Sequence, residues 1–177
     1  AAWRYVRPVS ANSPGTSLGT VLGVWAHPDD EAYLSSGLMA QAAAAGSRVV
    51  CVTATRGEGG SLDPERWPPE SLGDIRAAEL QRCLSLLGVE EHIFLELPDV
   101  DWHTPLPDAG ADAVASIMEQ VVPDTVLTFG PDGITGHPSN SASPISAAFP
   151  CARSTPVPAK ITGVFAFASR SAAAASC

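Results

Sequence analysis

The chain has 177 residues, 45% of them hydrophobic, which suits one domain with a sizeable core and excludes a disordered chain. Its net charge of -9 argues against a nucleic acid or an acidic membrane surface as partner, because both need basic patches. No stretch can span a membrane and residues 1–20 lack the apolar core of a signal peptide, so we expect a cytoplasmic protein. The chain begins without methionine, which leaves room for a removed leader. Its four cysteines show no CxxC spacing, so no zinc knuckle or disulfide framework is indicated.

Apolar runs and helical periodicity alternate along the chain from residue 21 onwards. Residues 1–20 are polar and contain several prolines and serines, which predicts an extended N-terminal arm. Apolar or β-branched runs predict four buried strands, and amphipathic stretches that end at Gly46, Gly88 and Pro123 predict three helices. In chain order we expect a strand at 21–26, a helix at 32–45, a strand at 48–55, a long loop at 56–73, a helix at 74–87, a strand at 93–97, a helix at 114–121 and a strand at 124–129. The loop at 56–73 is too long for an ordinary connection, so we expect it to be functional, with disorder as the alternative.

This alternation of strands and helices predicts the fold class. It favours a parallel sheet with right-handed crossovers and helices on both faces. We therefore expect an α/β fold, specifically a Rossmann-like three-layer sandwich with a mostly parallel sheet. Ligands of such sheets bind outside the carboxyl ends of the strands. Polar or chemically reactive side chains follow each of the four strands at this edge, at 27–31, 56–60, 99–103 and His137.

The most distinctive group follows the first strand, where His27, Pro28, Asp29, Asp30 and Glu31 succeed one another. Pro28 cannot donate to a sheet ladder, which supports the end of a strand here. Imidazole and carboxylate are both zinc ligands, so His27 and Asp30 are candidate ligands and Asp29 is the carboxylate beside a bound water. Two alternatives remain open. The acids form the solvated first turn of a helix, or they bind Mg²⁺ or Ca²⁺, which His27 disfavours.

The sequence AHPDDE resembles the signature of the LmbE-like (PIG-L) family, zinc-dependent deacetylases that act on N-acetylglucosamine conjugates and related amides. The resemblance implies that His27 and Asp30 bind Zn²⁺ and that Asp29 is the general base. It also implies substrate-binding roles for Glu58 in a Gly-Glu loop and for Arg76 in IRAAEL. For these two residues, a chance Gly-Glu pair and an ordinary solvated helix face are the alternatives. The GEGG loop lacks the spacing of a dinucleotide-binding motif.

A second resemblance lies in GHPSN, which is similar to the family's late GHPDH motif. It implies that His137 stabilises the oxyanion or acts as an acid, and it puts Asn140 in the position of the third zinc ligand. An amide oxygen is a poor zinc ligand beside imidazole, so we expect Asn140 to weaken the site. We expect His92 to be a turn residue, whereas the loop residue His103 lies at the end of the sheet from which it can reach a metal.

Beyond Pro138 the composition changes, since no Asp or Glu follows and alanine, serine and proline dominate. We therefore divide the chain into an N-terminal arm at 1–20, an LmbE-like α/β domain at 21–137 and an atypical tail at 138–177, which is truncated, divergent or frameshifted.

Three functions are compatible with these observations. The first is a zinc-dependent hydrolase that removes an acetyl or similar acyl group from an N-acetylglucosamine-type conjugate, with Asp29 activating the water. The second is a catalytically impaired relative that binds a sugar conjugate without hydrolysis. The third is a generic divalent-metal-binding α/β domain. In each case we expect a small-molecule partner, and the sequence does not indicate an oligomeric state.

Overall fold

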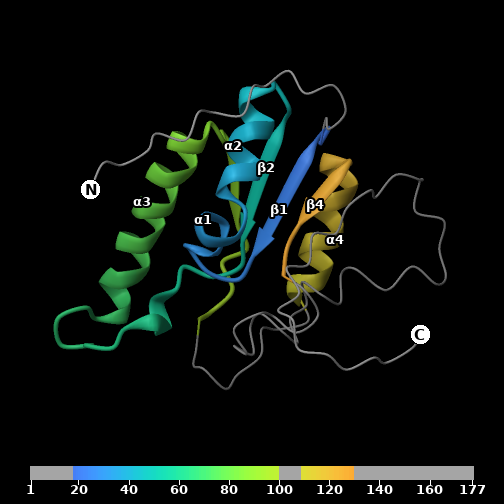
Figure 1. Ribbon diagram of the computed structural model, residues 1–177. Helices are drawn as coiled ribbons and strands as arrows, with labels where there is room; N and C mark the ends of the chain where they lie inside the picture. The colour runs from blue at the N-terminus through green and yellow to red at the C-terminus, as the bar shows by residue number, and fades with distance from the viewer. Residues whose placement is uncertain (1–17, 100–108, 130–177) are drawn as a thin grey trace, which may run out of the picture.

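The computed structural model describes residues 18–99 and 109–129, which contain a four-stranded sheet (Figure 1). Every pair of neighbouring strands is parallel, and the order across the sheet is β3-β2-β1-β4. The prediction of an α/β fold with a parallel sheet is confirmed. The strands are β1 (Val21–Trp25), β2 (Val49–Thr53), β3 (Glu91–Phe94) and β4 (Thr125–Leu127).

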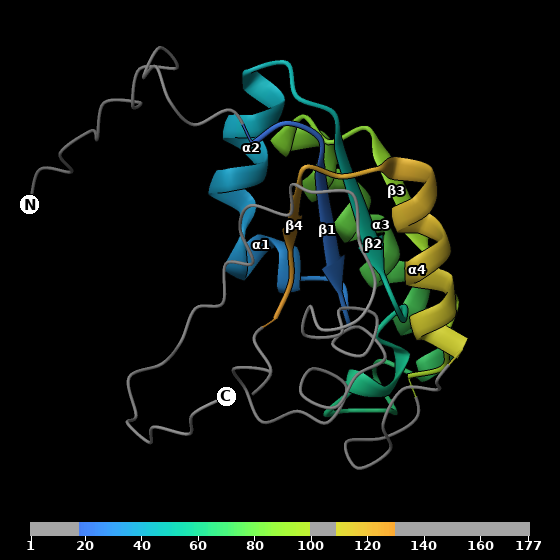
Figure 2. The same ribbon diagram turned by 90° about the vertical axis from the view of Figure 1, so that its right-hand side faces the viewer.

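Helices cover both faces of this sheet. Figure 2 shows α2 and α4 on opposite sides of the strands. Side chains alternate along β1, so Val21 and Trp25 pack with α2 and α3, while Leu22 and Val24 pack with α4. All of β1 is therefore buried, as its uninterrupted apolar run predicts. The helices are α1 (Asp30–Leu34), α2 (Ser36–Ala44), α3 (Pro69–Leu87) and α4 (Ala109–Val121), with a short 3₁₀ helix η1 (Glu58–Gly60).

Several element boundaries differ from the predicted ones. The helix expected at 32–45 is two helices, because Ser35 leaves helical geometry with φ -140° and its hydroxyl lies near the Glu31 carbonyl and the Met39 sulfur. Helix α3 begins at Pro69 and not at 74, since proline suits the first helical position. Helix α4 begins at 109 and not at 114, β3 spans 91–94 and not 93–97, and β4 is shorter than the expected 124–129.

The prediction that His92 is a turn residue is wrong. His92 lies within β3, and its ring Nε2 is 3.0 Å from the hydroxyl oxygen of Thr53 on β2. The predictions for most of the arm, for His103, for His137 and Asn140, and for the tail fall outside the described residues. No helix within 18–99 and 109–129 is long and apolar enough to cross a membrane.

Candidate functional site

The position of β1 in the sheet determines where a ligand is expected to bind. From β1 the chain adds β2 and β3 on one side, whereas β4 pairs with the other edge of β1. The direction of winding therefore changes beside β1, and ligands of open α/β sheets bind at this switch point, outside the carboxyl ends of the strands. Residues 27–31 leave β1 at this end, where α1 and η1 also lie (Figure 1).

The His27 ring lies between two carboxylates. Its Nδ1 is 3.7 Å from Oδ2 of Asp30, and its Nε2 is 3.5 Å from Oδ1 of Asp99. The same Asp30 oxygen accepts the backbone N–H of His27 at 2.9 Å. Burial raises the pKa of Asp30 to about 6, and the backbone N–H and ring of His27 oppose this shift. The two predicted zinc ligands are therefore adjacent and largely buried.

The chemistry and spacing of these two groups fit a zinc ion. Zinc bonds to nitrogen and oxygen ligands are about 2.0–2.2 Å long, so two atoms up to about 4 Å apart can bind the same ion. Nδ1 of His27 and Oδ2 of Asp30 meet this condition at 3.7 Å. Within the described ranges, however, no group of three or more His, Cys, Asp and Glu side chains is placed to hold a metal ion.

Asp29 has a strained backbone. Its φ of 121° lies in a region that non-glycine residues rarely adopt, and such strain is concentrated at functional sites. Its N–H donates to Glu31 Oε2 at 3.0 Å, and its side-chain Oδ2 accepts Arg76 Nη2 at 3.1 Å. With 53% of its side chain exposed, Asp29 is held in place by its neighbours and still accessible to solvent and ligands.

Glu31 is a buried carboxylate that the sequence interpretation did not single out as a site residue. It is only 1% exposed, so the solvated-first-turn alternative does not apply to it. Burial raises its pKa, while the hydrogen bond from the Asp29 N–H opposes the shift. The available sequence signal was its place in AHPDDE, directly after the candidate ligands.

Arg76 connects two of the loops at this edge. Its guanidinium donates to the carbonyls of Pro28 at 2.7 Å and Gly57 at 2.9 Å, in addition to Asp29. A side chain at Gly57 would collide with this guanidinium. Arg76 is thus brought to the predicted site and is not simply part of a solvated helix face.

Glu58 and Asp99 join the loops after β2 and β3. Oε1 of Glu58 accepts the Asp99 N–H at 3.1 Å, and Oδ2 of Asp99 accepts the Gly59 N–H at 3.0 Å. The other Glu58 oxygen, Oε2, is buried and has no hydrogen-bond partner among the described residues. Burial alone would raise the pKa of Asp99. The opposing effects of His27, Gly59 and Arg76 are together larger, so the pKa of Asp99 lies below its ordinary value.

Comparison with known proteins identifies the family. A family model described as PIG-L, GlcNAc-PI de-N-acetylase, matches residues 22–142. The chain belongs to the PIG-L family. A curated relative, the 1D-myo-inositol 2-acetamido-2-deoxy-alpha-D-glucopyranoside deacetylase of Kineococcus radiotolerans, is 34% identical over 148 residues, and the match covers 68% of this chain and 41% of the relative.

Solved structures share this fold. The N,N'-diacetylchitobiose deacetylase from Pyrococcus horikoshii superposes with a TM-score of 0.62 and 27% identity, over 72% of this chain and 47% of that protein. GalB, the 4-carboxy-2-hydroxymuconate hydratase of Pseudomonas putida KT2440, shares the fold at a TM-score of 0.59 and 22% identity, over 73% and 52%. The chain therefore spans only about half the length of these proteins.

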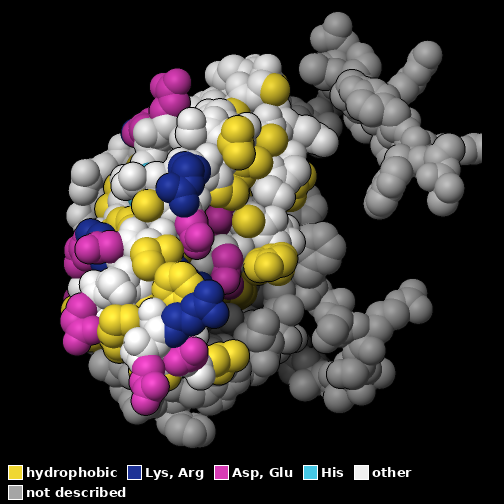
Figure 3. Space-filling model, turned by 90° about the vertical axis from the view of Figure 1, so that its left-hand side faces the viewer, with side chains coloured by type: hydrophobic (Ala, Val, Ile, Leu, Met, Phe, Trp, Pro, Cys, Tyr) yellow, Lys and Arg dark blue, Asp and Glu magenta, His cyan; other side chains and the backbone are white. Residues whose placement is uncertain are grey.

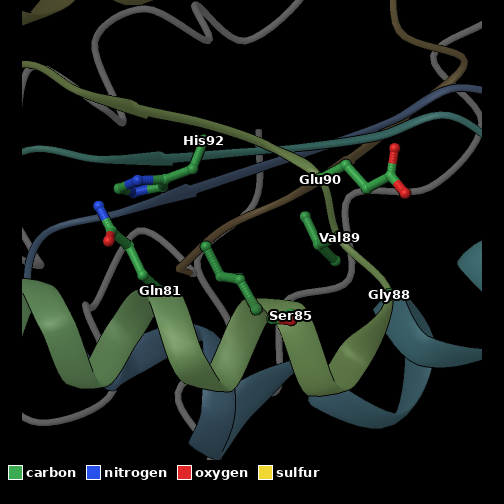
Figure 4. Close-up of a pocket in the computed structure, with 7 residues that line it drawn as sticks. Gln81, Ser85, Gly88, Val89, Glu90 and His92 are labelled. Atoms are coloured by element: carbon green, nitrogen blue, oxygen red, sulfur yellow. The ribbon is translucent and has the colours of Figure 1, made fainter.

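The PIG-L match includes all of the candidate site residues. It runs to residue 142 and so contains His137 and Asn140 as well as the AHPDDE motif. A separate cavity of about 550 Å³ lies between α3 and β3 and contains none of these residues. Its lining consists of Gln81, Leu84, Ser85, Gly88, Val89, Glu90 and His92 (Figure 4).

Proposed function

We propose that this chain carries a zinc-dependent deacetylase site that removes an acetyl or similar acyl group from the amide of an N-acetylglucosamine-type conjugate. The observation that carries the proposal is the pair of zinc-type donors, His27 Nδ1 and Asp30 Oδ2, 3.7 Å apart at the switch point of the sheet. The names of both deacetylase relatives describe acetylated amino sugars, which supports this substrate class.

In the proposed reaction, a zinc ion held by His27 and Asp30 would polarise the amide carbonyl and acidify the attacking water. Asp29 accepts the proton from that water and returns it to the leaving amine nitrogen. Arg76 holds the Asp29 carboxylate through its guanidinium and fixes the Pro28 carbonyl beside it. His137 stabilises the oxyanion, and Asn140 would occupy the position of the third protein ligand.

Glu58 is proposed to bind a substrate hydroxyl. A buried carboxylate oxygen without a partner costs free energy unless a donor satisfies it. Oε2 of Glu58 is such an oxygen among the described residues, and the Glu58 side chain is fixed through its other oxygen and the Asp99 N–H. A sugar hydroxyl is a suitable donor, since it carries one O–H group.

Zinc content and amide hydrolysis test the proposal together. The purified chain is dialysed against trace zinc, its metal is measured by elemental mass spectrometry, and release of free amine from N,N'-diacetylchitobiose is followed. We expect close to one zinc per chain and hydrolysis that a chelator abolishes, with both lost in His27→Ala. Hydrolysis that persists in the chelated enzyme would contradict a zinc-dependent reaction.

A second candidate is a relative that binds the sugar conjugate without hydrolysing it. Asn140 in the third-ligand position and the short span of the chain relative to its relatives favour this alternative. It predicts little or no bound zinc and measurable binding of N,N'-diacetylchitobiose in equilibrium dialysis. A preference for Mg²⁺ over Zn²⁺ would instead indicate a generic divalent-metal site.

A further inference from the structure

Asp99 links three segments that are far apart in the sequence. Its N–H donates to Glu58, its Oδ2 accepts the Gly59 N–H, and its Oδ1 lies 3.5 Å from Nε2 of His27. Its side chain is only 10% exposed. The carboxylate is therefore fixed by the loops after β2 and β3 and directed at the ring that follows β1.

The close approach of the two loops depends on a glycine. A β-carbon at Gly59 would come within 2.6 Å of the Asp99 backbone oxygen and 3.3 Å of its carboxyl carbon. Real β-carbons do not make the first of these contacts, so any other residue at position 59 would push Asp99 away from its present place. Gly59 thus allows the carboxylate to reach both its backbone donor and the His27 ring.

The two ring nitrogens of His27 face different carboxylates. In neutral imidazole one nitrogen donates a hydrogen bond and the other presents a lone pair, and only the lone pair binds a metal. Oδ2 of Asp30 already accepts a backbone N–H at 2.9 Å and lies 3.7 Å from Nδ1, a distance at which the two atoms can bind one zinc ion. Oδ1 of Asp99 is the nearer carboxylate oxygen to the ring, at 3.5 Å from Nε2.

We propose that Asp99 is a positioning residue that keeps the ring proton of His27 on Nε2 and so directs the Nδ1 lone pair toward Asp30. A carboxylate that holds the outer N–H of a ligating histidine fixes both the tautomer and the ring orientation. Asp99 does not itself ligate the ion, because it faces the ring nitrogen opposite the one that faces Asp30. The effect on zinc affinity rests on the proposed function, whereas the effect on the tautomer does not.

The test compares Asp99→Asn with a matched control, Glu96→Gln. In Asp99→Asn one acceptor oxygen becomes an NH₂ donor, so the side chain can no longer accept from both Gly59 and His27. Glu96 lies in the same segment and pairs with Arg56 at 2.7 Å, away from His27. The tautomer is read in the zinc-free chain above pH 8 by long-range ¹⁵N NMR of the imidazoles, with His27 assigned from a His27→Gln variant among the four histidines.

We expect His27 to be protonated on Nε2 in the unmodified chain and in Glu96→Gln, and to lose this single tautomer in Asp99→Asn. Zinc affinity, measured by competition with a chelating dye, is expected to fall by about 10- to 100-fold in Asp99→Asn alone. If Asp99→Asn does not fold, Gly59→Ala displaces Asp99 and gives the same readouts. A proton on Nδ1 in the unmodified chain, or an unchanged tautomer in the Asp99 variant, would overturn the proposal. Absence of zinc binding by the unmodified chain would reject the proposed function and leave the tautomer result to decide the role of Asp99.

Discussion

Asp29 combines a strained backbone, an exposed carboxylate and two fixed contacts. The contacts, its N–H to Glu31 and its Oδ2 to Arg76, hold the residue in a conformation that it would not adopt alone. Strain of this kind persists only where the surrounding structure enforces it, and it is concentrated where a side chain must be presented in one orientation. This is the property that a general base requires, since its oxygen must lie within hydrogen-bond reach of the proton it removes.

Asp29→Asn is expected to retain zinc and lose turnover. The amide has the shape of the carboxylate but cannot accept the proton, so kcat should fall by about 10²- to 10⁴-fold. The measurement is the rate of amine release, with zinc content determined on the same sample. His27→Ala is the contrasting variant and should lose both metal and turnover. Unchanged turnover in Asp29→Asn would show that Asp29 is not the general base.

Glu31 is expected to support the site through stability. Glu31→Ala removes the acceptor of the Asp29 N–H and leaves a cavity, which should lower the free energy of unfolding by about 2–4 kcal/mol. Glu31→Gln keeps an oxygen that accepts this N–H and should stay within about 1 kcal/mol of the unmodified chain. Urea unfolding of both variants gives the comparison. An equal loss of unfolding free energy in Glu31→Ala and Glu31→Gln would show that Glu31 does not stabilise the fold through its contact with the Asp29 N–H.

His92 is expected to make stability depend on pH. Burial lowers its pKa from 6.5 to about 4, so between these values the unfolded chain binds the proton more readily. The stability that the folded chain gains from keeping the buried His92 ring neutral is complete above pH 6.5 and is lost as the pH falls toward 4. Gln81 of α3 points toward the His92 ring across the cavity (Figure 4). Unfolding free energies at pH 7, 6, 5 and 4 should therefore decline less steeply in His92→Gln, and parallel curves would contradict this assignment.

At the level of elements, the sequence predicts strands better than helix ends. The apolar runs that became β1 and β2 are buried on both faces, and such runs have few other stable placements. The break at Ser35 depends on contacts of its hydroxyl with Glu31 and Met39 inside the folded chain, which no local pattern reveals. The start of α3 at Pro69 was predictable from the sequence, because proline is favoured at the first helical position.

The end of α3 gives a prediction that separates stability from function. Gly88 has a φ of +76°, and a β-carbon there would lie 3.3 Å from the Ala43 side chain. Gly88→Ala should therefore cost about 1–2 kcal/mol of unfolding free energy while leaving zinc content unchanged. Gly37→Ala is the matched control, since that helical position has nothing within 4 Å, and it should be neutral or stabilising by up to about 1 kcal/mol. A Gly88→Ala variant as stable as Gly37→Ala would contradict the role of Gly88 in ending α3.

At the scale of the molecule, the candidate site combines local and distant residues. His27, Asp29 and Asp30 lie within four consecutive residues, so the sequence alone indicates their chemistry and their proximity. The sheet order, with β1 between β2 and β4, brings the later loops to the same edge, and this general convergence was predictable from parallel topology. The individual contacts of Arg76 with Pro28 and of Asp99 with His27 were not, because they depend on how the loops pack.

The described surface mixes charged and hydrophobic side chains. On the face in Figure 3, acidic and basic side chains are interspersed with hydrophobic ones and no continuous basic patch is visible. The net charge of -9 has the same implication, since a polyanion would be repelled by the molecule as a whole. A small sugar conjugate needs only the local donors and acceptors at the carboxyl edge of the sheet.

Zinc is expected to stabilise the whole chain, because an ion that binds only the folded state shifts the unfolding equilibrium. At a free zinc concentration 100 times Kd the gain is about 2.7 kcal/mol, which corresponds to a rise in Tm on the order of 10 °C for a small domain. Thermal unfolding followed by circular dichroism, with zinc and then with excess chelator, measures this shift. Asp30→Asn should remove the shift, whereas Gly37→Ala should keep it, since a β-carbon at Gly37 meets nothing within 4 Å and so touches neither proposed ligand. An equal shift with Mg²⁺ would point to the generic metal-binding alternative, and no shift with either ion would mean that His27 and Asp30 do not form a zinc site in this chain.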